Sequence, residues 1–406
     1  MSSMLRISNR LRYCVVRVSL FMVAAMILAA LAGCEPTLDP GPAPSPYAPE
    51  ISTWHDLHAV RYHLDKSYVL MNDLDANTAG YDQLAGPTAN RGQGWQPIGT
   101  SEARFTGSFD GQGYQIRDLS INRPDEGLVG LFGAVDAGAV IRNLGVTNAA
   151  VIGEWAVGIL TGGNWGGIED SYSTGSVNGY DCVGGLVGGN AGSVSSCYST
   201  ASVTGCWDVG GLVGCNDPGA TVSRSYAAGG VTGEWSVGGL VGGNLGGTVS
   251  RSYAAAGVSG DDYVGGLVGD NQGSVGNCYS TGSVNGQWYV GGLVGWNDPG
   301  GSVNNCYSVG SVSADWHAGG LVGENDGGTV GNSFWDTQAS GVSDSDGGTG
   351  KATAAMQAMV TFTDTATQGL SQPWNLAAVA PGEANSAYIW NIVDGQAYPV
   401  LSWQSS

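Results

Sequence analysis

The sequence predicts an all-β fold, a right-handed parallel β-helix (solenoid) with small helical or β caps at both ends. Two observations predict it: a glycine-rich segment returns at nearly constant intervals, and short β-prone segments of fixed length follow each copy. The 406 residues include 70 glycines, and only 12% are charged. Most of the chain lacks the apolar period of amphipathic helices, which argues against helical bundles and α/β folds.

The recurring segment reads approximately VGGLVGxN. When the copies are aligned on the glycine after the first residue, successive copies lie 26, 26, 28, 27, 26 and 28 residues apart. A period of this length is typical of stacked supersecondary units. The aligned glycines are Gly158, Gly184, Gly210, Gly238, Gly265, Gly291 and Gly319.

The length of the unit varies at only one place. Each aligned glycine precedes its asparagine by 6 residues, and the valine or isoleucine of the following segment precedes the next aligned glycine by 16 residues. We therefore expect three short β segments per coil, for example around 186–187, 194–198 and 203. Each segment would pair with its counterpart one coil along, while the asparagine-to-valine turn faces solvent and absorbs insertions.

An asparagine closes every copy of the segment. Asparagine tolerates the left-handed backbone of a tight turn, and stacked amides can hydrogen-bond along a ladder. We interpret this column as a structural ladder, because a ligand-binding role would compete with the bonds that the side chains make to one another. The ladder comprises Asn164, Asn190, Asn216, Asn244, Asn271, Asn297 and Asn325.

A second column accepts leucine, cysteine and serine, so we expect it to face the interior, with its cysteines acting as buried apolar residues. Cys278 and Cys306 lie one coil apart in this column. A strand spacing of about 4.8 Å permits a disulfide between them on distance, though not obviously on side-chain direction. Cys182, Cys206 and Cys215 fall in three other columns, without a C-x-x-C motif, and their pairing stays open.

Two aromatic columns offer candidate binding surfaces. Aligned aromatic rings can bind sugars or a partner protein, although simple stacking between coils also accounts for their regularity. The first column is expected to point outward as a stacked ladder and contains Tyr172, Tyr198, Tyr226, Tyr253, Tyr279, Tyr307 and Phe334. The second column, interrupted by Asp181 and Asp262, supplies the candidate ligand-binding residues Trp155, Trp207, Trp235, Trp288 and Trp316.

The combination of VGGLVGxN with GSVxNCYSTGSVxG resembles the GLUG-motif repeat, which is found in bacterial surface proteins and in the non-catalytic regions of bacterial immunoglobulin A peptidases. The resemblance covers 157–334, and the flanking segments resemble those that usually accompany such repeats. It implies attachment or display rather than a reaction. The peptidase activity is not implied, because the four histidines do not form the zinc motif H-E-x-x-H.

The N-terminus predicts export. Four arginines precede an apolar run at 20–31, which is typical of a signal peptide. The run ends in LAGC, which resembles the lipobox of bacterial lipoproteins and implies lipidation of Cys34; the alternative is an ordinary cleaved signal with a chance cysteine. We therefore expect a membrane-anchored lipoprotein at the outer membrane or cell surface.

These features divide the chain into five parts. They are a lipoprotein signal peptide at 1–33, a Pro-rich tether at 34–50, an N-terminal cap with the first coils at 51–145, the repeat β-helix at 146–335, and a C-terminal capping segment at 336–406. Helices are expected at 52–65 and 353–360, where they would cover the apolar ends of the solenoid.

The charge of the mature chain disfavours nucleic acid as a partner. Removal of the signal peptide leaves ten basic and 34 acidic residues, a net charge of 10 − 34 = −24. Such a surface repels nucleic acid and anionic headgroups. The expected partners are the membrane, through the lipid anchor, and a glycan or a surface protein.

A search for reactive or cofactor-binding groups gives only weak candidates. Asp73, Asp75, Asp344 and Asp346 lie on turns and are weak calcium candidates, although the first pair lacks the EF-hand pattern. His55 and His58 are most simply solvent-side residues of the first helix, with a shared metal as the alternative. No other cofactor is expected.

No catalytic residue is identified, because the acidic side chains vary from coil to coil. The sequence therefore favours a non-enzymatic cell-surface scaffold for adhesion or display. The alternative is a carbohydrate-binding or polysaccharide-active protein, such as a lyase or a glycoside hydrolase, that uses the aromatic columns.

Overall fold

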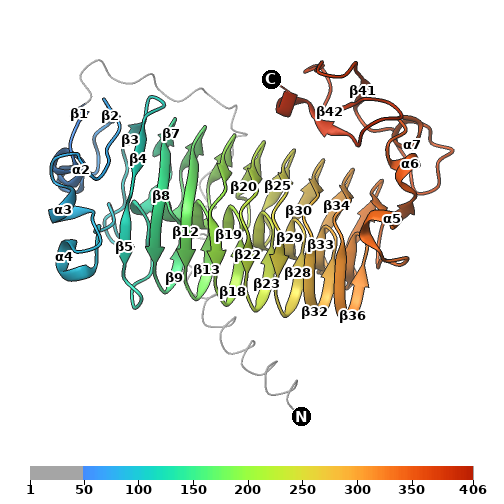
Figure 1. Cartoon of the computed structure of the whole chain (residues 1–406), viewed down its shortest axis with the longest axis horizontal. Coiled ribbons are helices and arrows are strands. Elements are labelled where there is room, and N and C mark those ends of the chain that lie inside the picture. The colour runs from blue at the N-terminus through green and yellow to red at the C-terminus, as the bar shows by residue number, and fades with distance from the viewer. Residues whose placement is uncertain (1–48, 406) are drawn as a thin grey trace, which may run out of the picture. The chain divides into compact units, whose positions relative to one another are not determined.

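The predicted parallel β-helix is confirmed by the computed structural model, which describes residues 49–405 (Figure 1). Three sheets run along this part of the chain, and every pair of strands within them is parallel. The expected signal peptide, the lipidation at Cys34 and nearly all of the tether lie outside the described residues.

Two of the three sheets take one strand from each coil. The 8-stranded sheet consists of β6 (Phe132–Val135), β10 (Thr161–Asn164), β14 (Val187–Asn190), β19 (Val213–Asn216), β24 (Val241–Asn244), β29 (Val268–Asn271), β33 (Val294–Asn297) and β37 (Val322–Asn325). The 11-stranded sheet consists of β1 (Glu50–Ile51), β2 (Tyr68–Leu70), β3 (Ser108–Asp110), β7 (Val140–Arg142), β11 (Gly167–Glu169), β15 (Ser193–Ser195), β20 (Thr221–Ser223), β25 (Thr248–Ser250), β30 (Ser274–Gly276), β34 (Ser302–Asn304) and β38 (Thr329–Gly331).

The third sheet is broken into shorter strands than the sequence pattern indicates. One coil contributes β16 (Tyr198–Ser199), β17 (Ser202–Thr204) and β18 (Trp207–Gly210) to this 21-stranded sheet. A typical coil therefore holds five strands rather than three segments. The unexpected strand is β18, where the tryptophan column and the start of the glycine segment share one strand.

The register confirms the alignment of the repeats and explains the invariant glycines. Val187 pairs with Val213, and Asn190 pairs with Asn216. The leucine and valine columns of the repeats are fully buried, with β-branched residues suited to the strands. A Cβ added at Gly210 would lie 1.9 Å from the carbonyl oxygen of Val213. Only glycine therefore permits the close corner between two strands at this position.

The asparagine column forms a continuous hydrogen-bonded ladder inside the solenoid. Each side-chain Nδ2 donates to the Oδ1 of the asparagine in the next coil, at 2.7 to 2.9 Å. The first six members are fully buried, whereas Asn325, at the open end, is half-buried. The ladder therefore commits these amides to the scaffold.

The cysteines of the repeats are either joined in a disulfide or present as free thiols. Cys182 and Cys215, which lie on adjacent coils, form a disulfide with a sequence separation of 33 residues. Cys197, Cys278 and Cys306 are buried free thiols, as the inward-facing column predicts, and Cys206 is a half-buried free thiol. Burial raises the pKa of the Cys197 thiol to about 12.

The N-terminal cap is a short helix, α2 (Trp54–Ala59), followed by a 3₁₀ turn (Val60–Tyr62). Thr53 and Asp56 form a capping box, so the helix begins where its first backbone N–H groups find partners. Trp54 and Leu57 are fully buried at the end of the core. The helix is shorter than the expected span of 52–65. His58 is half-buried against Trp95, rather than facing solvent, and burial lowers its pKa.

The remaining helices are single turns in the two end regions (Figure 1). They are α3 (Tyr81–Leu84), α4 (Ala89–Gly92), α5 (Thr337–Ser340), α6 (Thr353–Met356) and α7 (Val360–Thr363).

The C-terminal segment does more than cap the end. Residues 337–351 cover the last coil: β40 (Thr349–Lys351) pairs with β39 (Phe334–Asp336), and Ser345 Oγ accepts a hydrogen bond from the backbone of Val322. The chain then turns back, and β41 (Leu376–Ala378), β42 (Trp390–Ile392) and β43 (Val400–Leu401) form a separate small sheet. This part packs on the tyrosine column, so the late members of that column are buried instead of exposed.

We expect the asparagine ladder to tolerate a break at its end better than in its middle. Asn244→Ala would orphan the buried amide nitrogen of Asn216 and leave the buried oxygen of Asn271 with only the backbone N–H of Gly273, which costs about 2 to 3 kcal/mol. Asn325→Ala removes only the terminal partner of Asn297 and costs about 1 kcal/mol. Urea unfolding measures both. Equal losses would contradict a ladder that acts as a continuous network.

We also expect native cysteines to differ sharply in reactivity. At pH 8 iodoacetamide should modify Cys206 slowly, whereas buried Cys197, Cys278 and Cys306 should react only after unfolding. Burial raises the pKa of Cys197 and Cys278, which reduces their thiolate fraction further. Peptide mass mapping reads each site, and Cys182 and Cys215 should be labelled only after reduction. Native labelling of Cys278 would show that its column is not interior.

Candidate functional site

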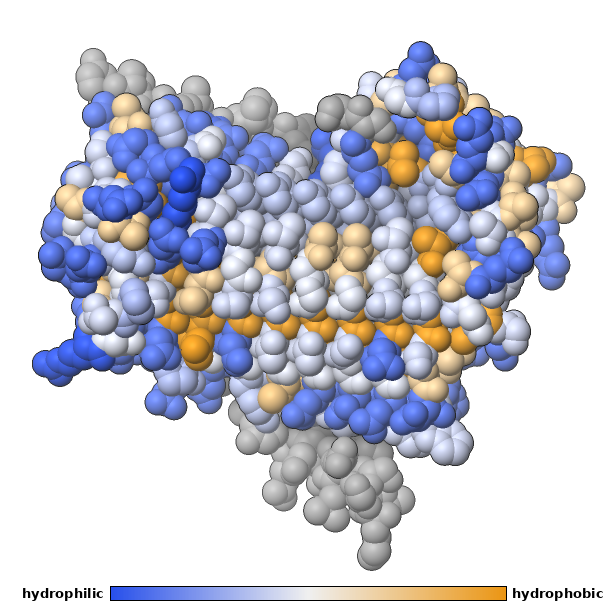
Figure 2. Space-filling view, in the orientation of Figure 1, coloured by the Kyte–Doolittle hydropathy of each residue, from blue (hydrophilic) through white to orange (hydrophobic). Residues whose placement is uncertain are grey.

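One face of the coils is chemically uniform (Figure 2). Figure 2 shows a face of mostly pale, small residues crossed by one narrow hydrophobic line, with strongly hydrophilic residues gathered toward the ends of the stack and its lower edge. Functional chemistry must therefore be sought where the repeat departs from its own pattern.

The departures gather in two neighbouring outward columns, which we call the variable strip. Unlike the leucine, valine and asparagine columns, they hold residues of every chemical class. The first column, which directly follows the tryptophan position within the same strand, contains Ala156, Cys182, Asp208, Ser236, Tyr263, Tyr289 and His317. The second column contains Gly163, Gly189, Cys215, Gly243, Asp270, Trp296 and Glu324.

The backbone explains why the first column can vary. All seven of its residues have left-handed backbone angles, with φ between 48° and 57°. This region is strained for residues other than glycine and persists only where the surrounding structure enforces it. The geometry of the coil, and not the identity of the residue, therefore sets the direction of these side chains, although Ala156, Ser236 and Tyr263 are buried by their neighbours.

The late coils of the strip form an aromatic cluster. Trp296 contacts Tyr263 and Tyr289, with ring centroids 4.9 and 4.8 Å apart. Tyr289 also lies 4.9 Å from the ring of His317. His317 Nδ1 is 3.4 Å from Glu324 Oε2, so a carboxylate and an imidazole border the aromatic surface. Burial, with the charges of Glu324 and Asp262, raises the pKa of Tyr289 and keeps it a neutral donor.

The predicted tryptophan column does not act as one surface. Trp207 stacks on Trp235 at 5.3 Å, and Trp288 stacks on Trp316 at 5.5 Å, so the two pairs cover part of their own ring faces. Trp155 lies apart, with its indole packed closely over Gly127. Trp316, the last of the column, is 60% exposed and Trp288 is 38% exposed. The structure therefore brings the exposed pair together with the aromatic cluster.

The tyrosine ladder offers little aromatic face to a ligand. Adjacent rings lie 4.8 to 5.0 Å apart and within 7° of parallel. The C-terminal segment covers Tyr279 and Tyr307, and Trp403 lies against Tyr226 and Tyr253. Stacking and this intramolecular cover account for the regularity of the ladder.

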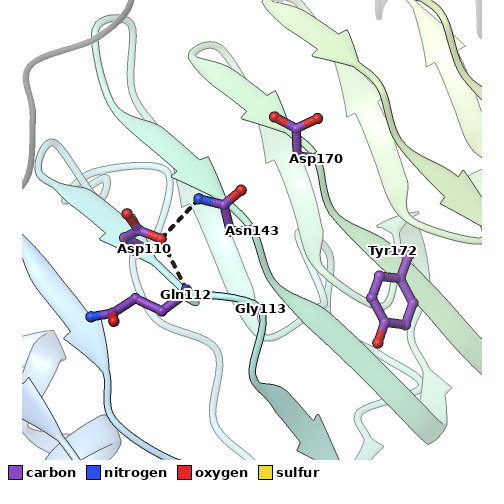
Figure 3. Close-up of a pocket in the computed structure, with 6 residues that line it drawn as sticks. All are labelled: Asp110, Gln112, Gly113, Asn143, Asp170 and Tyr172. Carbon is purple, nitrogen blue, oxygen red and sulfur yellow. Dashed lines mark hydrogen bonds between the residues drawn. The ribbon is translucent and has the colours of Figure 1, made fainter. Parts of the chain in front are cut away.

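A separate depression of about 470 Å³ lies among early coils (Figure 3). It is lined by Asp110, Gln112, Gly113, Asn143, Asp170 and Tyr172. Figure 3 shows Asp110 accepting hydrogen bonds from Asn143 Nδ2 and from the backbone N–H of Gln112, at 3.0 and 2.9 Å. Burial opposes the charged form of Asp110, but these bonds and the charge of Arg142 outweigh it and lower its pKa. The carboxylate is therefore held as a charged structural acceptor rather than as a proton donor.

The calcium candidates are not brought together as metal sites. Asp73 accepts a hydrogen bond from Arg117 at 2.6 Å, and Asp75 accepts one from the backbone of Asn77 at 2.8 Å. Asp344 and Asp346 accept bonds from the backbones of neighbouring segments or residues. Within residues 49–405, the one group of three or more side chains arranged to hold a metal is Asp181, Cys182, Asp208 and Cys215.

This cluster and the aromatic cluster escaped the sequence analysis for the same reason. The alignment of the repeats identified the columns correctly. It did not show which columns lie next to one another across a corner of the coil. A disulfide offset of 33 residues, one coil plus seven, is the signal that joins the two columns of the strip.

Among the described residues, no helix has the length and apolar character needed to cross a membrane.

Comparison with known proteins agrees with the repeat architecture. The family model described as "The GLUG motif" matches residues 179–204, 260–285 and 286–313. A "Putative Gly-rich membrane protein" of Evansella cellulosilytica is 36% identical over 133 residues, which cover 32% of this chain and 14% of that protein. Halomucin of Haloquadratum walsbyi is 36% identical over 145 residues, which cover 34% of this chain and 2% of that protein.

One solved structure also aligns along much of the solenoid. It is described as a "putative immunoglobulin A1 protease" from Bacteroides ovatus, with 21% identity and a TM-score of 0.48 over 70% of this chain and 85% of that chain. The chain spans only a small part of the length of these two sequence relatives. Three segments of the repeat region thus match the GLUG motif, and the repeats are wound into a parallel β-helix.

Proposed function

We propose that this protein is a non-enzymatic surface scaffold that uses its β-helix to display an attachment site. The observation that carries the proposal is the contrast between its columns. The valine, leucine and asparagine columns are committed to the scaffold, whereas exposed tryptophans lie beside aromatic and polar groups of the variable strip in the late coils. The similarity to a protein named as a membrane protein and to Halomucin supports a surface location.

The proposed attachment to the membrane is a lipid on Cys34. The Pro-rich tether would hold the β-helix off the bilayer, because such segments favour extended conformations. The acidic charge of the chain would reduce its contact with anionic headgroups and direct its binding groups outward.

A more specific candidate function is carbohydrate binding. It is favoured by the exposed Trp316, which lies near His317 and Glu324. Trp316 ends its column, so no further tryptophan covers its outer side, and 60% of its surface is exposed. An aromatic face flanked by hydrogen-bonding groups suits the apolar face and the hydroxyls of a sugar.

A reaction is not part of the proposal. In the depression among the early coils, Asp110 is fixed by its partners, and the groups in the aromatic cluster suit binding. Release of reducing ends or unsaturated products from a polysaccharide would replace this proposal with the polysaccharide-active alternative.

The exposed tryptophan pair tests the binding role. Trp288→Ala with Trp316→Ala should reduce attachment to immobilised glycans at least tenfold, because exposed aromatic anchors commonly carry the larger share of binding energy. Trp207→Ala with Trp235→Ala, a stacked pair in the same column, is the matched control and should retain binding. Glycan-array titration measures the effect, and circular dichroism checks folding.

Several outcomes of that experiment would reject parts of the proposal. A wild-type protein that binds no glycan but binds surface proteins, with the same loss in the Trp288/Trp316 variant, would reject the carbohydrate ligand and keep the attachment site. Equal losses in both pairs would reject the assignment of binding to the late coils.

Cys34→Ser tests the anchor independently of the ligand. Without the thiol that accepts the lipid, the exported protein should move from the membrane fraction to the soluble fraction. Fractionation with immunoblotting, together with mass measurement of the N-terminal peptide, gives the readout. Unchanged membrane association would contradict lipid anchoring, whatever the ligand.

A further inference from the structure

Three side chains of the variable strip and one of the neighbouring tryptophan column meet at one place in the early coils. Asp181 and Cys182 lie on β13 (Asp181–Gly184), Asp208 lies on β18, and Cys215 lies on β19. Their potential metal-binding atoms all lie within 4.8 Å of one another. Cys215 is buried and the other three are half-buried, so the cluster is partly shielded but reachable.

The register explains how these residues are brought together. Asp181 pairs with Trp207 and Val183 pairs with Val209, which places Cys182 and Asp208 at equivalent positions of successive coils. Both have left-handed φ angles, 50° and 48°, and therefore turn outward in the same direction. Cys215 reaches the pair from the adjoining column. The scaffold thus fixes the direction of each donor before any ligand binds.

Asp181 and Cys215 depart from the pattern of their columns, whereas Cys182 and Asp208 lie in a column that has no common residue. Asp181 stands in the tryptophan column, and Cys215 stands in a column whose neighbours on either side are Gly189 and Gly243. Cys182 and Asp208 succeed one another in the first column of the strip, after Ala156. The stacking of the coils requires none of these four residue types. Their proximity therefore indicates a shared chemical role.

We propose that, when the Cys182–Cys215 disulfide is reduced, the four side chains form a zinc-binding site. Two thiolates and two carboxylates supply four ligands, and Zn²⁺ favours tetrahedral sites of sulfur, nitrogen and oxygen donors. Two sulfurs on one tetrahedral zinc ion lie about 3.8 Å apart, given Zn–S bonds of about 2.3 Å.

The disulfide and the metal exclude each other. A dithiol reductant transfers two electrons and two protons to the disulfide, which gives two cysteine thiols and the oxidised, cyclic form of the reductant. On binding zinc, each thiol releases its proton to solvent and coordinates the ion through sulfur. Either state links the same adjacent coils, so zinc would restore, in the reduced protein, the cross-link that the disulfide provides.

Reduced and oxidised full-length protein provide the first test, which needs no variant. Competition with a chromophoric chelator should show one tightly bound zinc per chain in the reduced protein and none at this site in the oxidised protein. Cobalt, used in place of zinc, should give thiolate-to-metal absorption only after reduction. Zinc should also raise the melting midpoint of the reduced protein, because it binds the folded state. Equal zinc binding by both redox forms would overturn the proposal.

Variants then identify the ligands. Asp181→Asn with Asp208→Asn should leave the disulfide intact in the oxidised protein and weaken zinc binding by the reduced protein at least tenfold. Asp262→Asn, in the same column as Asp181 but on a later coil, and Cys206→Ser, outside the cluster, are matched controls that should retain zinc. Full affinity in the Asp181/Asp208 variant would overturn the four-ligand site.

Discussion

The structure depends on the hydrogen bonding of each strand to the same strand of the next coil. This pairing holds the coils about 4.8 Å apart and keeps every column in register along the stack. It also requires the chain to turn corners so tight that an added Cβ at Gly210 would overlap a neighbouring carbonyl oxygen. The many glycines, which carry no functional groups, are therefore needed for the strands of successive coils to pair. This pairing in turn aligns equivalent side chains into columns.

A column of identical side chains at this spacing interacts mainly with itself. The asparagine amides bond to one another, and the tyrosine rings stack with centroids 4.8 to 5.0 Å apart. Such regularity stabilises the coil but covers the polar atoms or ring faces that a ligand would need. Repetition in a solenoid is thus a sign of scaffold, whereas a break in a column, or the end of one, leaves chemical groups available.

The fold was largely predictable because register is encoded locally. Constant distances from Gly184 to Asn190 and from Val194 to Gly210 determine which residues pair, and the observed partners agree with that alignment. The inward position of Cys278 follows from the same alternation. The missing information concerned contacts between columns and between distant segments. The Cys182–Cys215 disulfide depends on a corner geometry set by left-handed residues, and the burial of Tyr307 depends on a segment that returns some ninety residues later.

The same reasoning explains why the two candidate sites occupy opposite ends of one strip. Left-handed turns project the first column of the strip outward at every coil, so each coil can present a different group without disturbing the ladder. In the early coils the strip holds Cys182, Asp208 and Cys215 beside Asp181 of the tryptophan column, and the disulfide between the two cysteines cross-links adjacent coils. In the late coils the strip holds aromatic rings beside His317 and Glu324, where Trp316 ends its stack and remains exposed. A regular β-helix can thus present different chemical groups on different coils. The left-handed backbone fixes the direction of the side chain at this position, whereas the residue type can vary.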